Sequence, residues 1–222
     1  MSFSQQLKQS IAGYHLLEHL FYQKWTEGQL NPETLQHYAK EYYQYVKAFP
    51  RYISATHSLC EDITKRKVLL ENLNEEEGSM GKDHPQLWSE FATGVGASEE
   101  SLQQHTGGKA INHVIDTFFK CARSSYSEGL ASLYAYEYQV PEVAKTKIDG
   151  LKKFYAIDDE KSLAFFKVHQ SADVIHREAC ENLLDQFSPA EQNKALQAAK
   201  NSAKALWNFL TEMNDYDEKL AC

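Results

Sequence analysis

Residues 162–187 read SLAFFKVHQSADVIHREACENLLDQF, and the apolar residues of this segment recur at the spacing of one face of a long helix. At about 100° per residue, His169, Asp173 and His176 fall within about 60° of one another. They share the apolar face, so their side chains are expected to point into the protein. Burying such groups without partners costs roughly several kcal/mol. A metal ion would pair with imidazole and carboxylate together, and a hydrogen-bonded polar trio is the alternative.

Two further regions carry ionisable residues at apolar helical positions. Glu137 continues the apolar stripe of its predicted helix, and either Glu76 or Glu77 ends another. His84 opens the helix that follows across a short loop. Together with the first segment, three carboxylates and three histidines come from three helical regions. Bundles that hold two divalent cations are built in this way, and ligands without thiolates favour iron or manganese.

Composition limits the function. The chain has 222 residues with 42% hydrophobic and 24% charged residues, which is typical of a globular protein. A net charge of -8 without a local block of lysine and arginine argues against nucleic-acid binding. Neither a secretion signal nor a stretch of bilayer length is visible, so we expect a cytoplasmic protein without a membrane partner. Four widely spaced cysteines suit reduced thiols.

Helical periodicity runs through nearly the whole chain. Helices are predicted at 4–25, from Asn31-Pro32 toward residue 60 with a kink or break at Pro50, and at 61–77. Shorter ones follow, and a last helix begins after Ser188-Pro189. Neither an internal repeat nor a flexible linker interrupts the pattern. The sequence therefore predicts an all-α bundle in a single domain over residues 1–222.

Five blocks of sequence, in order, resemble a known family. The blocks are LEHLFYQKW at 17–25, YAKEYY at 38–43, KAFPRY at 47–52, YEYQVPE at 136–142 and the histidine–aspartate–histidine motif of the opening segment. They are similar to the chlamydial proteins associating with death domains and their bacterial relatives. This group belongs to the haem-oxygenase-like dimetal oxygenases and is related in fold to the thiaminase TenA and the oxidase PqqC. The resemblance implies a seven-helix haem-oxygenase-like bundle that forms a homodimer.

The resemblance also implies a ligand set for two divalent metal ions, either iron–iron or manganese–iron. The corresponding residues of this chain are Glu76, His84, Glu137, His169, Asp173 and His176. The loop before His84 is one residue longer than in the family, so Glu77 remains an alternative to Glu76. The alignment without a gap from the helix side favours Glu76.

The family's activity implies that the protein makes para-aminobenzoate for folate biosynthesis from one of its own tyrosines. This reaction requires dioxygen and a reductant. Tyr22 corresponds to the sacrificed tyrosine and Lys147 to the amino donor, while Tyr38 and Tyr136 correspond to accompanying active-site tyrosines. A buried lysine has a lowered pKa, which would make its amine neutral and nucleophilic. One turnover per chain is expected.

Two other functions remain open. The chain could be a dimetal oxygenase that acts on an external small molecule, with Tyr22 as a cavity wall. It could instead be a protein-interaction module that binds a death domain, a partner suggested by the resemblance alone. Single-turnover behaviour without added substrate distinguishes the para-aminobenzoate synthase from the oxygenase that acts on an external molecule. Loss of metal binding would favour the protein-interaction module.

Overall fold

The computed structural model describes residues 1–79 and 81–221, and the side chains of residues 171–176 lie outside this description. The described chain forms helices without any strand, which confirms the all-α prediction. It is divided into more than seven helices, because short turns interrupt the N-terminal part and α6 is a separate short element. The elements are α1 (Phe3–Ile11), η1 (Ala12–Tyr14), η2 (Leu16–Glu18), α2 (Leu20–Glu27), α3 (Pro32–Ser58), α4 (Ile63–Glu76), α5 (His84–Gly94), α6 (Glu99–Gln104), α7 (Lys109–Ser124), α8 (Tyr126–Glu137), α9 (Val140–Phe154), α10 (Glu160–Leu184) and α11 (Pro189–Leu220).

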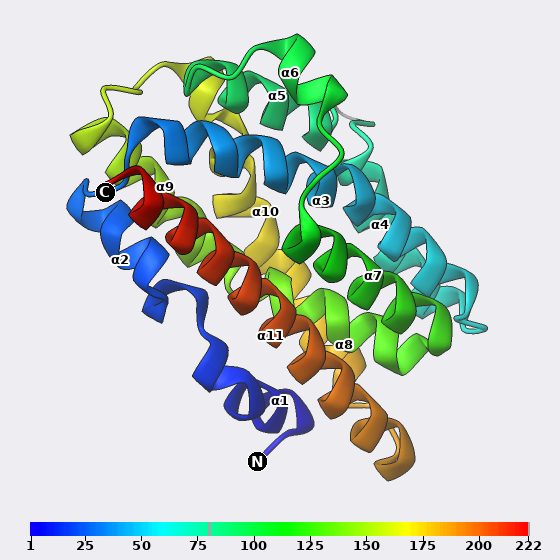
Figure 1. Ribbon diagram of the computed structural model, residues 1–222. Coiled ribbons are helices and arrows are strands. Elements are labelled where there is room, and N and C mark those ends of the chain that lie inside the picture. The colour runs from blue at the N-terminus through cyan, green and yellow to red at the C-terminus, as the bar shows by residue number, and fades with distance from the viewer. Residues whose placement is uncertain (80, 222) are drawn as a thin grey trace.

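Three long helices, α3, α10 and α11, carry the packing of the bundle (Figure 1). Helix α11 packs on α8 and α7, α10 packs on α9 and α5, and α3 packs on α7, α4 and α5. The inner faces of α3, α8 and α10 therefore surround a common interior. The ionisable residues singled out in the sequence lie on helices that border this space.

Local capping sets where the helices begin. The side chain of Asn31 accepts a hydrogen bond from the backbone N–H of Glu33, and Pro32 occupies the first turn of α3. Ser188 and Glu191 form a reciprocal capping box at the start of α11. Both helix starts predicted from the sequence are thereby confirmed. Helix α3 continues through Pro50 to Ser58, so of the kink or break predicted at Pro50 the break is wrong.

The prediction of one continuous first helix over residues 4–25 is also wrong. Two 3-10 turns separate α1 from α2. The backbone N–H of Leu16 donates to Oε1 of Gln139 at 2.8 Å, and the ring Nδ1 of His19 accepts from the N–H of Phe21 at 3.1 Å. The first contact joins residues 123 positions apart in the chain, so tertiary structure overrides the local helical pattern.

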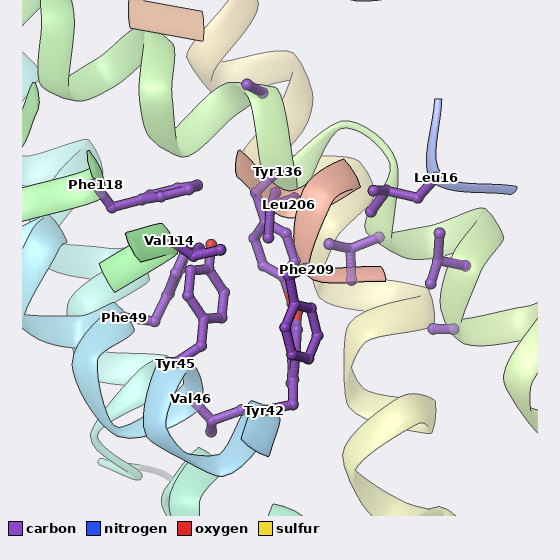
Figure 2. Close-up of a cluster of buried hydrophobic side chains, with 14 of the residues drawn as sticks. Leu16, Tyr42, Tyr45, Val46, Phe49, Val114, Phe118, Tyr136, Leu206 and Phe209 are labelled. Carbon is purple, nitrogen blue, oxygen red and sulfur yellow. The ribbon is translucent and has the colours of Figure 1, made fainter. Parts of the chain in front are cut away.

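Aromatic side chains fill much of the interior. Tyr42 and Tyr45 rise from α3 toward Tyr136 of α8, beside Phe209 of α11 (Figure 2). All four side chains are buried. Among the described residues, none of the helices is both long enough and apolar enough to cross a bilayer.

Candidate metal centre and adjoining pocket

Three predicted ligands converge in the interior. Glu76 ends α4, His84 begins α5 and His169 lies in α10. One ligand atom from each residue lies within 4.8 Å of the others. The three residues are only 6%, 6% and 4% exposed, respectively. Nδ1 of His84 is 2.6 Å from Oε2 of Glu76, so a proton or a cation is needed between their lone pairs.

The connection from α4 to α5 brings the first two ligands together. Gly78 adopts a φ of +75°, and a Cβ atom there would lie 2.5 Å from the backbone nitrogen of Asp83. Glycine is therefore required for this tight return of the chain. Asp83 then caps α5 by accepting a hydrogen bond from the N–H of Gln86. His84 consequently begins α5 facing the end of α4.

A backbone hydrogen bond orients the ring of His169. Its Nδ1 lies 2.6 Å from the carbonyl oxygen of Phe165, which can only accept a hydrogen bond. Nδ1 therefore carries the proton, and Nε2 has the lone pair in the neutral ring. Metal-binding histidines are commonly oriented by such a second contact. The rings of His169 and His84 have centroids 4.5 Å apart.

A second carboxylate lies beside this cluster. Glu137 ends α8 and is 3% exposed. Its Oε1 accepts a hydrogen bond of 2.7 Å from Nδ2 of Asn72, which lies one helical turn before Glu76 on α4. Sγ of Cys180 is 3.7 Å from its other oxygen. Asn72 was not predicted as a site residue, although its position four residues before Glu76 places it on the same helical face.

The donor set fits a divalent cation. Two carboxylates are buried here, and their named contacts are an amide, an imidazole and a thiol, which carry no permanent positive charge. Buried carboxylates are costly without a compensating charge. Carboxylate oxygen and imidazole nitrogen are ligands for iron, manganese and zinc. A metal ion between Glu76, His84 and His169 would bind their lone pairs and offset the charge of the buried carboxylates.

The remaining predicted ligands divide into two groups. Asp173 and His176 belong to the residues whose side chains lie outside the described part of the structure. Glu77, the alternative to Glu76, is exposed at the C-terminal end of α4. It does not join the group formed by Glu76, His84 and His169.

A narrow cavity adjoins the cluster and leaves about 20 Å³ for the centre of a water molecule. Its polar wall contains four predicted site residues that lie on separate helices, namely Tyr22, Tyr136, Lys147 and His169. Tyr42, which was not predicted, completes this wall. Apolar side chains of α9, α10 and α11 close the rest. Three of the four predicted tyrosine and lysine positions, Tyr22, Tyr136 and Lys147, thus share one cavity with a candidate metal ligand, whereas Tyr38 does not line it.

Lys147 is buried among aromatic rings. Its residue is 4% exposed, and Nζ lies between 4.9 and 5.9 Å from six ring centroids. Burial lowers the pKa of Lys147 to about 7. A large fraction of the amine is therefore neutral near neutral pH. The sequence contained a signal for this burial, because Val143, Lys147 and Leu151 follow one another at four-residue spacing on α9.

Hydrogen bonds link the tyrosines to one another and to the lysine. Nζ of Lys147 donates to the hydroxyl of Tyr38 at 2.7 Å, and the hydroxyl of Tyr38 also acts on the neighbouring Tyr22, whose pKa it lowers against the larger, raising effect of burial. The hydroxyl of Tyr42 donates to that of Tyr136 at 2.9 Å. Burial is the main cause that raises the pKa of Tyr22 and of Tyr38, so both phenols stay protonated at neutral pH. Tyr42 was not predicted, although it lies one turn beyond Tyr38 on α3.

A glycine contact brings Tyr22 and Lys147 together. A Cβ atom on Gly150 of α9 would lie 2.5 Å from the indole ring of Trp25, so only glycine permits the close approach of α2 and α9. Nε1 of Trp25 also donates to the carbonyl oxygen of Lys147 at 3.3 Å. Tyr22 lies on the same helix as Trp25. Nζ of Lys147 is consequently 5.6 Å from the centroid of its ring.

Residues 36–207 match the sequence family described as iron-containing redox enzyme. The chain is 41% identical to the 4-aminobenzoate synthase of Chlamydia muridarum over 211 residues, which cover 95% of this chain and 89% of that protein. It is 40% identical to the 4-aminobenzoate synthase of Nitrosomonas europaea over 234 residues, covering 100% and 95% of the two chains.

Solved structures support the fold. A TenA homologue from Pseudomonas syringae superposes with a TM-score of 0.82 at 18% identity, covering 96% of this chain and 93% of that one. A domain from Shewanella denitrificans with a haem-oxygenase-like fold gives a TM-score of 0.77 at 15% identity, covering 98% and 92%. A CADD-like protein from Nostoc punctiforme gives 0.79 at 17% identity, covering 97% and 96%. The helical bundle is therefore haem-oxygenase-like.

Proposed function

The chain belongs to the family of iron-containing redox enzymes, and we propose that this oxidoreductase makes 4-aminobenzoate from its own Tyr22, with Lys147 as the source of the amino nitrogen. Relatives named 4-aminobenzoate synthase, at about two-fifths identity over nearly the whole chain, support the product. The reaction consumes dioxygen and a reductant. Each chain acts once, because the tyrosine is not regenerated.

One observation carries this proposal above all others. Lys147, whose pKa is lowered to about 7 by burial, lies with Tyr22 in one cavity that also contains His169. An ammonium group cannot form a bond through nitrogen, whereas a neutral amine can. Desolvation therefore prepares the one buried lysine of this cavity for transfer of its nitrogen to an aromatic ring.

The size of the cavity supports a substrate that belongs to the chain itself. The space left for the centre of a water molecule is about 20 Å³. A cavity that binds benzene has a volume of about 150 Å³. An external aromatic substrate would need the surrounding side chains to move, whereas the ring of Tyr22 already lies in the wall.

The carbon skeleton of the product is that of a tyrosine side chain. Breaking the Cα–Cβ bond of Tyr22 releases the ring with one further carbon, and oxidation of that carbon gives the carboxylate. The nitrogen of Lys147 bonds to the ring carbon that held the phenolic oxygen, and this oxygen leaves as water. The Cε–Nζ bond of Lys147 breaks in turn, and Cε is oxidised to an aldehyde whose oxygen comes from water. Dioxygen takes up the electrons that the organic groups lose. The external reductant supplies the remaining electrons that are needed to reduce dioxygen to water.

The neighbouring tyrosines have positioning roles in this proposal. The hydroxyl of Tyr38 accepts a hydrogen bond from Nζ of Lys147 and so holds the amine where it lies 5.6 Å from the centroid of the Tyr22 ring. Because hydroxyls both donate and accept, Tyr38 can also take a proton from the amine as it reacts. Tyr136, held by Tyr42, covers the side of the cavity toward Glu76.

The metal would be held by Glu76, His84 and His169, joined by Glu137 and by Asp173 and His176. We propose two ions, as iron–iron or manganese–iron. When bound, such a pair supplies the one-electron and dioxygen chemistry that oxidation of a phenol requires. Burial of the cluster by α3, α8 and α10 keeps bulk water away from it.

The test is the mass of the intact chain before and after dioxygen and a reductant are added to the iron-loaded protein. We expect at most one 4-aminobenzoate per chain, and a loss of mass that peptide mapping locates at Tyr22. Tyr22→Phe keeps the ring volume and should fold, yet it should yield no product, because phenylalanine is far harder to oxidise.

Tyr126→Phe is the matched control. Tyr126 does not line the cavity that contains Tyr22, and it does not belong to the metal cluster. It should give the wild-type yield. Product at wild-type yield from Tyr22→Phe, or many turnovers per chain, would refute the sacrificial reaction. An oxygenase acting on an external small molecule would then be the better account.

A further inference from the structure

A second, smaller cavity lies on the other side of Tyr136. Its lining includes Tyr45 and Phe49 of α3 as well as Glu76 and His169 of the metal cluster. It leaves about 10 Å³ for the centre of a water molecule, which is room for one molecule of about that size. Tyr136, Phe165 and His169 line both cavities and form the wall between them.

Tyr45, one of the residues that line this small cavity, has a buried hydroxyl that points to a ligand. Tyr45 is 1% exposed, and among the described residues its hydroxyl has no hydrogen-bond partner. An unsatisfied buried hydroxyl costs about 1–3 kcal/mol, so such groups are rare unless a ligand or water completes them. Figure 2 shows Tyr45 and Phe49 side by side on α3, facing the region into which Tyr136 projects.

The hydroxyl is also a permanent donor. Burial is the main cause that raises the pKa of Tyr45 well above its usual value. Neighbouring groups, which include Glu137 and Glu76, raise this pKa further. The group therefore keeps its proton at all ordinary pH values. Phe49 and Val46 make the rest of the α3 wall apolar. The cavity thus combines one donor, apolar walls and the edge of the metal cluster, and it excludes anything larger than a few atoms.

We propose that this small cavity is the binding chamber for dioxygen beside the metal cluster, and that the Tyr45 hydroxyl is its hydrogen-bond donor. The proposal rests on the proposed function, because it takes the cluster to hold iron. The tyrosine–lysine cavity then holds the organic groups, and the wall of Tyr136, Phe165 and His169 separates them from the diatomic ligand. Tyr45 is a positioning residue that touches the ligand through one hydrogen bond.

Nitric oxide is a diatomic probe of matching size that binds iron(II) without turnover. The experiment measures the N–O stretching band and the rate of nitric oxide release for the iron(II)-loaded protein without dioxygen. Tyr45→Phe removes only a hydroxyl that has no partner among the described residues, so the variant should fold. We expect its N–O band to shift and its release rate to rise about fivefold, the factor that one neutral hydrogen bond contributes.

Tyr52→Phe is the matched control. Tyr52 lies two turns further along α3, is fully buried and also has a hydroxyl without a partner among the described residues, yet it lines neither cavity. Its variant should give the wild-type band and release rate. The iron content of all three proteins is measured in parallel and should be equal.

Identical bands and release rates in the wild-type and Tyr45→Phe proteins, at equal iron content, would overturn the chamber alone. Loss of iron from Tyr45→Phe would also overturn it, because the hydroxyl would then belong to metal binding. A wild-type protein that takes up iron and responds to Tyr45→Phe but makes no 4-aminobenzoate would refute the proposed function and keep the chamber. A wild-type protein unable to bind iron would refute both.

Discussion

At the level of single residues, the burial of Lys147 carries an electrostatic cost. Its ammonium group would lie among six aromatic rings, where the cation–π attraction and one hydrogen bond to Tyr38 only partly replace water. The net result is a pKa lowered from 10.5 to about 7. A cost of this kind is typical of residues retained for chemistry.

This shift predicts a dependence of stability on pH. Between about pH 7 and 10.5 the unfolded chain keeps a proton on Lys147 that the folded chain has released. The free energy of unfolding of the wild-type protein should therefore rise with pH through this window, by about 1.4 kcal/mol per unit relative to Lys147→Met. Below pH 7 both states are protonated, and the difference should become constant.

Urea denaturation of both proteins at several pH values measures this difference. Lys145→Met serves as the control, because Lys145 is an exposed residue of the same helix. Its denaturation should follow the pH dependence of the wild type. Parallel curves for the wild type and Lys147→Met would show that the amine is charged in the folded protein, which contradicts the role given to it.

At the scale of elements, the start of α7 depends on a side chain from α3. Gly108 at the N-cap offers no capping side chain. Instead, Glu41, which is 2% exposed, accepts a hydrogen bond of 2.7 Å from the N–H of Gly108 and lies 2.7 Å from Nε2 of His105. A carboxylate at this position also interacts favourably with the helix dipole. The two helices are thereby joined by a buried polar contact.

Glu41→Ala should lower the free energy of unfolding by about 2–4 kcal/mol, because the cap is lost, His105 loses its partner and a cavity forms. Urea denaturation measures the change. Glu71→Ala, at an exposed position of α4, should stay within about 0.5 kcal/mol of the wild type. A similarly small effect at Glu41 would mean that water caps α7 equally well.

The contrast between local and distant contacts explains what the sequence could predict. Helix starts at Asn31 and Ser188 depend on residues within three positions, and both were predicted. The apolar spacing of α4 likewise indicated burial of either Glu76 or Glu77, and Glu76 is the buried one. The break before α2 depends on Gln139, and the contact between Tyr42 and Tyr136 joins residues 94 positions apart. Such contacts follow from the packed bundle and leave no local pattern.

Periodicity within one helix also indicates burial without indicating what a residue faces. Lys147 falls on the apolar stripe of α9, but its aromatic neighbours come from α2, α3, α5 and α10. The hydroxyl of Tyr45 gives no sequence signal at all, because tyrosine suits any half-buried helical position. The site was therefore predictable as a set of inward residues and not as two separate cavities.

At the scale of the whole molecule, the metal cluster connects elements that are otherwise joined through packing. Glu76, His84 and His169 come from α4, α5 and α10. A cation bound among them would link three helices in the folded chain and would have no such site in the unfolded one. Metal binding and folding are then thermodynamically coupled.

Iron(II) should consequently raise the melting temperature. At a free concentration of about 100 times Kd, binding contributes about 2.7 kcal/mol, which for a chain of this length corresponds to a rise of about 5–10 °C. Differential scanning calorimetry without dioxygen, with and without iron(II), measures the shift. His84→Ala removes one ligand and should abolish most of it, while the unloaded variant remains helical by circular dichroism.

The control for this experiment is His113→Ala, because His113 is an exposed residue of α7. The variant should keep the full iron-dependent rise, which separates specific binding from general effects of a divalent cation. A rise that survives in His84→Ala would place the iron elsewhere. An unchanged melting temperature in the wild-type protein would mean that the buried carboxylates are neutralised by protons, and the oxidation proposed for Tyr22 would lose its metal.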